Sequence, residues 1–123
     1  KDFAGCLKTG DVVLFYGDLG AGKTTFIQGV MSKFGVKKFV RSASFMLVNE
    51  FETKNVNLYH LDLYRLAETD IFELGFDEYL NGKGIAFVEW SERLKGYKKQ
   101  KRWEIKIEYQ NEKNRKITIK RFK

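Results

Sequence analysis

Eight residues near the start of the chain, 17–24, have the spacing of a phosphate-binding loop, G-x-x-x-x-G-K-[ST]. Its glycines let successive backbone N–H groups approach phosphate oxygens at the positive end of a helix dipole. We expect Lys23 to contact the β- and γ-phosphates and the Thr24 hydroxyl to take one magnesium position. The motif therefore predicts a nucleotide site made of Asp18, Leu19, Gly20, Ala21, Gly22, Lys23 and Thr24.

This chemistry requires that the loop join a strand to a helix, and the flanking sequence predicts both elements. The apolar run 12–16 is typical of a strand buried inside a parallel sheet. After the loop, apolar residues recur at helical spacing from Phe26 to Phe34, and Gly35 stands where a helix C-cap glycine belongs. The loop is therefore expected between the end of a buried strand and the start of an amphipathic helix.

Hydrolysis of a bound nucleotide also needs a carboxylate at the metal and a group that positions water. Glu89 ends the apolar run 85–88, so we expect it at the carboxyl edge of a parallel sheet, beside the loop. Asp62 interrupts an apolar strand and serves either the same metal or an ion pair with Arg65. We predict Lys23, Asp62 and Glu89 as catalytic residues, and Thr24, Asp62 and Glu89 as metal ligands.

Three further residues have less specific patterns. His60 is the only histidine and alternates with apolar neighbours, which favours a hydrogen-bonded structural role over general-base catalysis. Trp90 follows Glu89 directly and is either core, a cap on the nucleotide site or a contact for a partner. Cys6 is the only cysteine, so we expect no intramolecular disulfide and no Cys/His zinc site, and a buried or half-buried thiol.

The rest of the sequence predicts one α/β domain spanning residues 1–123. Residues 45–52 and 57–63 have the pattern of a β-hairpin, and 103–109 with 116–122 that of a closing C-terminal hairpin. Residues 69–79 have the pattern of a short amphipathic helix. No apolar run approaches the roughly 18 to 20 residues of a membrane span, so we expect a soluble, cytoplasmic protein without membrane contact.

The net charge of +7 is concentrated at the C-terminal end. Residues 93–123 contain 13 Lys or Arg and only 3 Asp or Glu, whereas residues 1–92 contain 10 and 13. Such a segment either meets an RNA backbone or an acidic protein surface, or is a solubilising exposed face.

Features that the sequence lacks argue against two other classes of nucleotide-binding enzyme, GTPases and small-molecule kinases. A GTPase would need an N-K-x-D base-reading segment, which does not occur, and a small-molecule kinase would need a lid and a substrate domain, for which 123 residues leave little room. The remaining alternative is a non-catalytic RNA- or protein-binding regulatory module that uses nucleotide as a switch.

Five separated motifs together resemble the TsaE family, also called YjeE, the small bacterial P-loop ATPase of tRNA threonylcarbamoyladenosine synthesis. The family motif G-D-L-G-A-G-K-T-T is matched without a change. The segments S-P-T-[FY]-x-L-V-x-x-[FY], Y-H-x-D-L-Y-R-L, E-L-G-x-x-[DE]-Y and E-W-P resemble later parts of the chain, in the family order. The five motifs, beginning with G-D-L-G-A-G-K-T-T, correspond in this order to residues 17–25, 42–51, 59–66, 73–79 and 89–91.

The resemblance implies a P-loop NTPase-like three-layer fold, with a mixed central sheet flanked by helices and a C-terminal β-hairpin. It also implies magnesium-dependent ATP hydrolysis to ADP, weak in isolation and activated on the TsaB–TsaD heterodimer. There hydrolysis supports repeated threonylcarbamoyl transfer to the adenosine next to the anticodon. Contact with tRNA would be indirect or through the basic C-terminal hairpin.

The sequence departs from the family pattern at a few positions. Ala43 and Ser91 replace family prolines, and Ser44 replaces a switch-like threonine while keeping the hydroxyl that would sense the γ-phosphate and metal. The family's N-terminal strand and helix are largely absent before the loop. The resemblance adds Thr25, Ser44 and Trp90 to the nucleotide-binding residues that the loop motif predicts.

Overall fold

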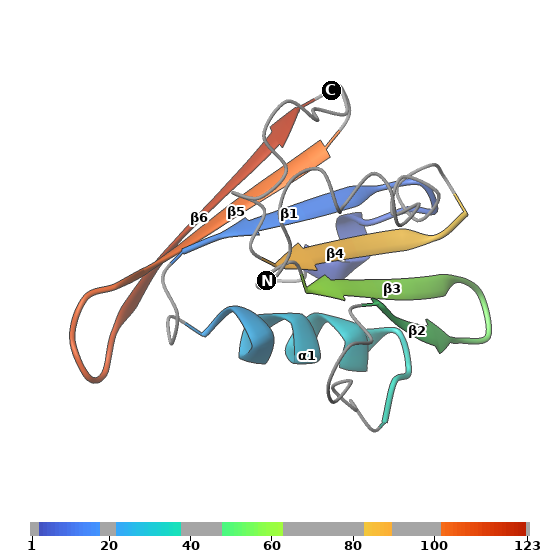
Figure 1. Cartoon of the computed structure of the whole chain (residues 1–123), viewed down its shortest axis with the longest axis horizontal. Helices are drawn as coiled ribbons and strands as arrows, with labels where there is room; N and C mark the ends of the chain where they lie inside the picture. Colours follow the sequence, from blue (N-terminus) through green and yellow to red (C-terminus); the bar gives the residue numbers. More distant parts are fainter. Residues whose placement is uncertain (1–2, 18–21, 38–47, 63–82, 90–101, 123) are drawn as a thin grey trace.

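The computed structural model describes residues 3–17, 22–37, 48–62, 83–89 and 102–122, with the side chains of Thr24, Val48 and Asp62 outside the description. These residues form a six-stranded sheet with one α-helix and one short 3-10 helix (Figure 1). The elements in chain order are η1 (Phe3–Cys6), β1 (Val12–Tyr16), α1 (Lys23–Lys33), β2 (Val48–Glu52), β3 (Asn57–Asp62), β4 (Ile85–Glu89), β5 (Arg102–Tyr109) and β6 (Arg115–Phe122).

The sheet is mixed, with strand order β2-β3-β4-β1-β5-β6. The four inner strands β3, β4, β1 and β5 run parallel, and the outer strands β2 and β6 are antiparallel to their neighbours. Both predicted hairpins are therefore confirmed in the described residues, β2 with β3 and β5 with β6. Three described strands differ from the predicted bounds by one residue: β4 includes Glu89, β5 begins at Arg102 and β6 begins at Arg115.

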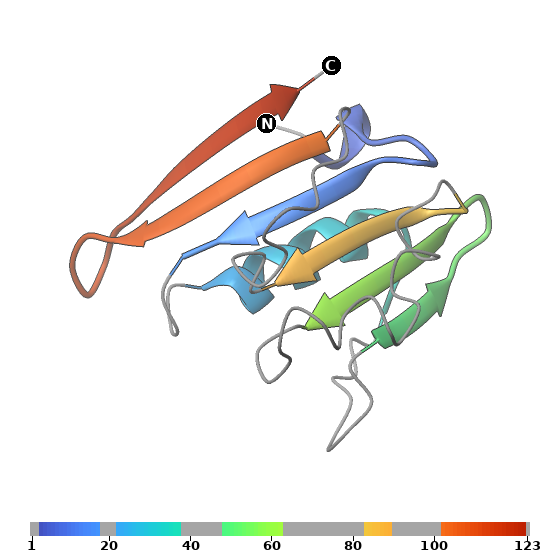
Figure 2. The same cartoon turned by 45° about the horizontal axis from the view of Figure 1, so that its top comes forward.

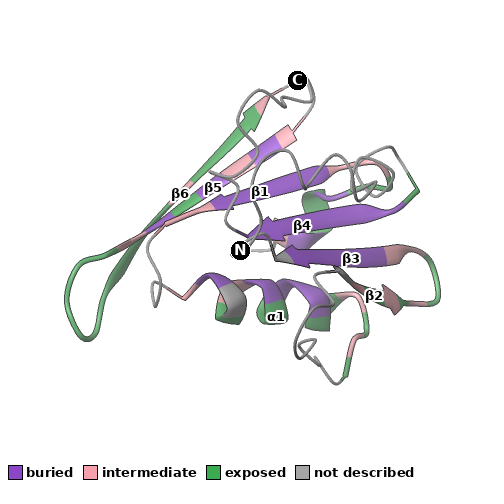
Figure 3. Cartoon of the chain, viewed as in Figure 1, coloured by how far each residue is buried: buried purple, intermediate pink, exposed green. Residues whose placement is uncertain are grey.

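One face of the sheet packs against α1 and η1 (Figure 2). Side chains alternate along each strand, so Val13 and Phe15 of β1 join Phe87 of β4 under Ile27 and Met31 of the helix. The opposite face is buried as well, through the alternate residues Val12, Leu14, Leu61, Ala86 and Val88. Both faces of the central strands are thus covered (Figure 3), as the three-layer α/β prediction requires.

Helix α1 ends as the glycine pattern predicts. Gly35 has φ of +102°, a left-handed conformation that glycine adopts at low cost. Its N–H donates to the carbonyl of Ser32, and the N–H of Val36 donates to that of Met31. This pair of bonds is a Schellman motif, which satisfies carbonyls that the last helical turn leaves without partners.

Two predictions about residues outside the site have different outcomes. Cys6 is exposed, so the prediction of a buried or half-buried thiol is wrong: η1 lies at the surface and buries only Ala4. The helix predicted for residues 69–79 lies outside the described residues. In the part of the chain that the structure describes, no helix is long and apolar enough to cross a lipid bilayer.

Candidate nucleotide site

The predicted phosphate loop leaves the carboxyl end of the central strand β1 and returns at the start of α1. Gly22 is the N-cap of the helix, with φ of +98°, and no side chain caps it. The first turn of α1 contains no acidic residue. The first N–H groups of a helix lack intrahelical partners and carry partial positive charge, so this end favours an anion such as phosphate.

Lys23 is buried at 4% exposure although it carries an ammonium group. Its Nζ donates a hydrogen bond to the carbonyl of Gly17, at 2.7 Å, so the side chain reaches back from the helix to the start of the loop. An ammonium has three donors, so a lysine that makes such a bond can also donate to a phosphate oxygen. The lysine is therefore held at the loop as a compact positive charge, the arrangement that the motif predicts for a phosphate contact.

Gly17 is required by the sheet as well as by the loop. It has φ of +144°, and a Cβ built at this position would overlap the carbonyl oxygen of Ile107 on β5. The chain therefore turns into the loop at a point where only glycine fits against the neighbouring strand.

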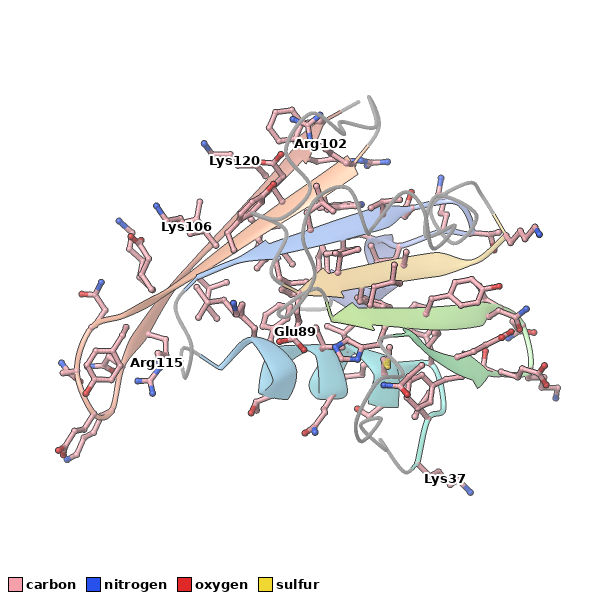
Figure 4. The ribbon with its side chains drawn as sticks, in the orientation of Figure 1. Lys37, Glu89, Arg102, Lys106, Arg115 and Lys120 are labelled. Carbon is pink, nitrogen blue, oxygen red and sulfur yellow. The ribbon has the colours of Figure 1, made fainter. Side chains whose placement is uncertain are left out.

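The two predicted acids end neighbouring parallel strands. Asp62 is the last residue of β3 and Glu89 the last of β4, and the two are register partners. Parallel strands direct their carboxyl ends to the same edge, which is also the edge where β1 enters the loop. Glu89 is 2% exposed and lies on the α1 side of the sheet, above the helix in Figure 4. The expected location of Glu89 is thus observed, while its role stays a prediction.

His60 contacts Glu89 directly. The Nε2 atom of His60 lies 2.6 Å from Oε2 of Glu89, and both side chains are almost fully buried, at 0% and 3% exposure. A hydrogen-bonded role for His60 is what the sequence favoured. Its partner was not expected, because the two residues are 29 positions apart and only the register of β3 with β4 brings them together. The available signal was a lone histidine two residues before Asp62, on the same face of the strand.

Magnesium is commonly bound by one or two carboxylates together with substrate phosphates. Among the described residues, no group of three or more His, Cys, Asp or Glu side chains gathers as a metal site. Asp62 and Glu89 instead end neighbouring strands at the edge where β1 enters the loop, and Lys23 is held at the start of that loop. Two acids at such strand ends suit a magnesium–nucleotide complex better than a protein-only metal cage.

Of the other predicted site residues, the structure describes only Thr24 and Thr25. Thr25 is exposed in the first turn of α1, and Thr24 is helical, with its side chain outside the description. Asp18, Leu19, Gly20, Ala21, Ser44, Arg65 and Trp90 lie outside the described residues.

The basic C-terminal end is a two-stranded ribbon that extends from the sheet (Figure 1). Its strand β6 is exposed or half-buried at every residue. Lys106 and Lys120 lie on the side away from α1, whereas Arg115 lies near the turn (Figure 4). Some of this charge is compensated, since Arg102 pairs with Glu104 at 2.7 Å and Lys106 with Glu108 at 3.6 Å.

The chain is similar to known proteins of one family. The family model described as "Threonylcarbamoyl adenosine biosynthesis protein TsaE" matches residues 1–117. A Bacillus subtilis protein named "tRNA threonylcarbamoyladenosine biosynthesis protein TsaE" is 39% identical over 112 residues, covering 91% of this chain and 70% of that protein. A Nostoc protein of the same name is 38% identical over 120 residues, covering 94% of this chain and 74% of its own length.

A solved structure shares the fold. The crystal structure of Bacillus subtilis YdiB superposes with a TM-score of 0.81 at 36% sequence identity, covering 98% of this chain and 74% of that one.

Proposed function

The chain belongs to the TsaE family of tRNA threonylcarbamoyladenosine biosynthesis proteins, and from this premise we propose that it is an ATP-hydrolysing subunit of that pathway. The observation that carries the proposal is the meeting of three features at one sheet edge. These are the lysine that reaches back over the loop, the uncapped start of α1 and the buried carboxylate that ends β4. Together they supply phosphate binding and a carboxylate beside it.

In the proposed site, the loop residues 18–25 cradle the phosphates of ATP through backbone N–H groups, and Lys23 contacts the β- and γ-phosphates. Ser44 senses the γ-phosphate and Trp90 closes the nucleotide pocket. Thr24, Asp62 and Glu89 would hold magnesium directly or through water, and the ion would supply neutralisation of the phosphate charge.

Glu89 orients the attacking water and accepts its proton during hydrolysis. Its burial supports this role, because interactions of a carboxylate are stronger in a region of low dielectric than in bulk water. Lys23 stabilises the negative charge that ADP and phosphate share as the bond breaks. Because these residues lie on a strand and a helix of the core, the geometry is held by the fold itself.

The working context follows from the family. We propose that the subunit is weakly active alone, acts in the cytoplasm and docks on the TsaB–TsaD heterodimer. There its ATP hydrolysis supports repeated threonylcarbamoyl transfer to the adenosine beside the anticodon. The basic β5–β6 ribbon is the part of the chain that would contact tRNA, if the subunit touches tRNA directly.

One observation favours the alternative of a nucleotide-gated, non-catalytic binding module. The described residues include three exposed large apolar side chains, Tyr109, Ile117 and Ile119, and all three lie on the basic ribbon. In that alternative the basic ribbon binds RNA or a protein partner. Nucleotide binding would only switch the chain between conformations that differ in affinity for that partner.

Substitution of Glu89 separates the two functions. We expect Glu89→Ala to bind ATP with an affinity close to that of the parent and to hydrolyse it about 10²- to 10⁴-fold more slowly, the usual loss for a missing general base. Glu52→Ala, which removes an exposed carboxylate at the end of β2, is the control and should keep the parental rate. Hydrolysis by Glu89→Ala at the parental rate would contradict the proposed role.

A further inference from the structure

His60 is fully buried on β3, close to the carboxyl edge of the sheet, with its side chain directed to the predicted catalytic carboxylate. We propose that His60 is a positioning residue, whose Nε2–H holds the carboxylate of Glu89 in the orientation needed at the nucleotide. This inference rests on the proposed role of Glu89. It assigns His60 neither proton transfer nor contact with the substrate.

The contact itself points to this role. The Nε2–Oε2 distance of 2.6 Å is slightly shorter than the usual range of about 2.7–3.2 Å for N–H···O hydrogen bonds. With Glu89 ionised, as its proposed role requires, the carboxylate only accepts hydrogen bonds, and the proton of this bond is then on Nε2 of the imidazole. The bond therefore fixes the orientation of both rotatable groups at once.

Burial makes the bond restrictive. His60 is 0% exposed and Glu89 is 2% exposed, so bulk water is kept away from this pair. A buried carboxylate is costly without hydrogen-bond partners, which holds Glu89 against the imidazole. A carboxylate has roughly four acceptor sites, so a group that is held by an imidazole can also accept a hydrogen bond from a water.

The sheet explains why the donor comes from this position. Phe87 is the register partner of His60, and Asp62 is the register partner of Glu89. His60 therefore approaches Glu89 diagonally, from one residue pair further inside the sheet, while Asp62 stands at the edge. Strand β3 thus carries both the donor that orients Glu89 and the second predicted carboxylate. Groups fixed on neighbouring central strands hold a geometry more closely than groups on loops.

A purely structural explanation is weaker at this place. Buried imidazole–carboxylate pairs add little net stability compared with apolar side chains of similar volume. The pair also lies at the carboxyl edge of the sheet, on the side where α1 carries Lys23, rather than in the middle of the core. Partners that orient a reacting group typically contribute 10- to 100-fold to activity.

Two amide variants of His60 test the proposal as a matched pair. The amide nitrogen of Gln reaches about as far as Nε2 of His, whereas that of Asn falls short by about one bond length. We expect His60→Gln to keep kcat within about 3-fold of the parent, and His60→Asn and His60→Phe to lower it by about 10- to 100-fold. KM and the affinity for ADP should change by less than about 2-fold in all three folded variants.

A second measurement needs no nucleotide. His60 is the only histidine of the chain, so ¹⁵N NMR of the apo protein gives a single imidazole spin system. We expect the tautomer with the proton on Nε2, with slow exchange of that proton in the parent. In Glu89→Ala the exchange should be faster and the Nε2 signal shifted. A proton on Nδ1, or a signal that Glu89→Ala leaves unchanged, would overturn the proposal.

The outcomes separate this inference from the proposed function. If Glu89→Ala hydrolyses ATP normally, the proposed function fails first. If Glu89→Ala stops turnover while folded His60→Asn matches the parent, the positioning role alone is wrong. If all His60 variants, including Gln, lose stability, nucleotide affinity and kcat together, His60 is a structural residue and the proposal is overturned.

Discussion

The first glycine of the phosphate loop provides a test of how the sheet shapes the site. In Gly17→Ala the new Cβ would meet the backbone carbonyl of Ile107, which a side-chain rotation cannot move away. The residue also keeps a φ of +144°, in a region that residues with a Cβ rarely occupy. The substitution therefore combines a steric clash with backbone strain, at the point where β1 passes beside β5.

The expected loss of stability can be worked from these two terms. A sparsely populated backbone conformation costs about 1–3 kcal/mol, and a clash that forces a backbone shift costs about 1–3 kcal/mol more. The free energy of unfolding should fall by about 2–6 kcal/mol, a large part of the about 5–15 kcal/mol of a typical domain. In a chain of this length that corresponds to a drop in Tm of roughly 4 °C per kcal/mol.

Gly35→Ala is the matched control. Gly35 also has a positive φ, of +102°, but a Cβ built there has no atom within 4 Å. It should lose only the conformational term, about 1–2 kcal/mol. Urea unfolding of the parent and both variants gives the comparison. If Gly17→Ala is as stable as Gly35→Ala, the contact with β5 does not dictate glycine and the reasoning is refuted.

Two further predictions concern charge. Lys23→Ala should weaken ATP and ADP binding by roughly 10- to 150-fold, since a hydrogen bond to a charged group contributes about 1.5–3 kcal/mol. Lys33→Ala, at the exposed end of the same helix, is the control and should change the dissociation constant little. If a fluorescent-nucleotide titration gives equal effects for the two variants, the result would argue against the loop site. If the basic ribbon meets tRNA, the double variant Lys116→Gln with Lys120→Gln should weaken tRNA binding and lower its salt dependence by up to about 2 units of slope, while ATP binding is unchanged. Lys37→Gln, at an exposed position away from the basic ribbon (Figure 4), is the control. If Lys37→Gln lowers the tRNA affinity as much as the double variant does, the effect comes from net charge alone.

Much of the local structure could be predicted from the sequence because local patterns determine it. The apolar run of β1, the helical spacing after the loop and Gly35 identified the strand, the helix and its end, and the alternation in β5 and β6 identified the closing hairpin. Each of these features depends on residues close together in the chain.

The order of the strands could not be read in the same way. That β1 lies between β4 and β5, and that β3 lies beside β4, follows from contacts between residues far apart in sequence. For the same reason the clash that reserves position 17 for glycine was not visible, because Ile107 belongs to a strand about ninety residues further on.

In the candidate site, too, the features set by neighbouring residues were predicted and a contact between distant residues was not. The candidate phosphate loop and the candidate acid Glu89 were predicted from their immediate neighbours, as a motif and as an acid that ends an apolar run, and the structure places Glu89 at the expected strand end. The contact between His60 and Glu89 was missed, since it depends on the register of two parallel strands. A single histidine in an apolar strand gives no sign of which side chain it will face, and the structural role favoured for it did not include the predicted catalytic acid.

The central claim is that this TsaE-family chain hydrolyses ATP as a subunit activated by its partners. The most direct test measures ATP turnover by the chain alone and after addition of the TsaB–TsaD heterodimer, with Glu89→Ala in parallel at each step. We expect low turnover alone, a large rise with the heterodimer, and no rise in the Glu89 variant. Negligible turnover with and without the heterodimer, while ATP still binds, would contradict the claim and favour a nucleotide-gated binding module.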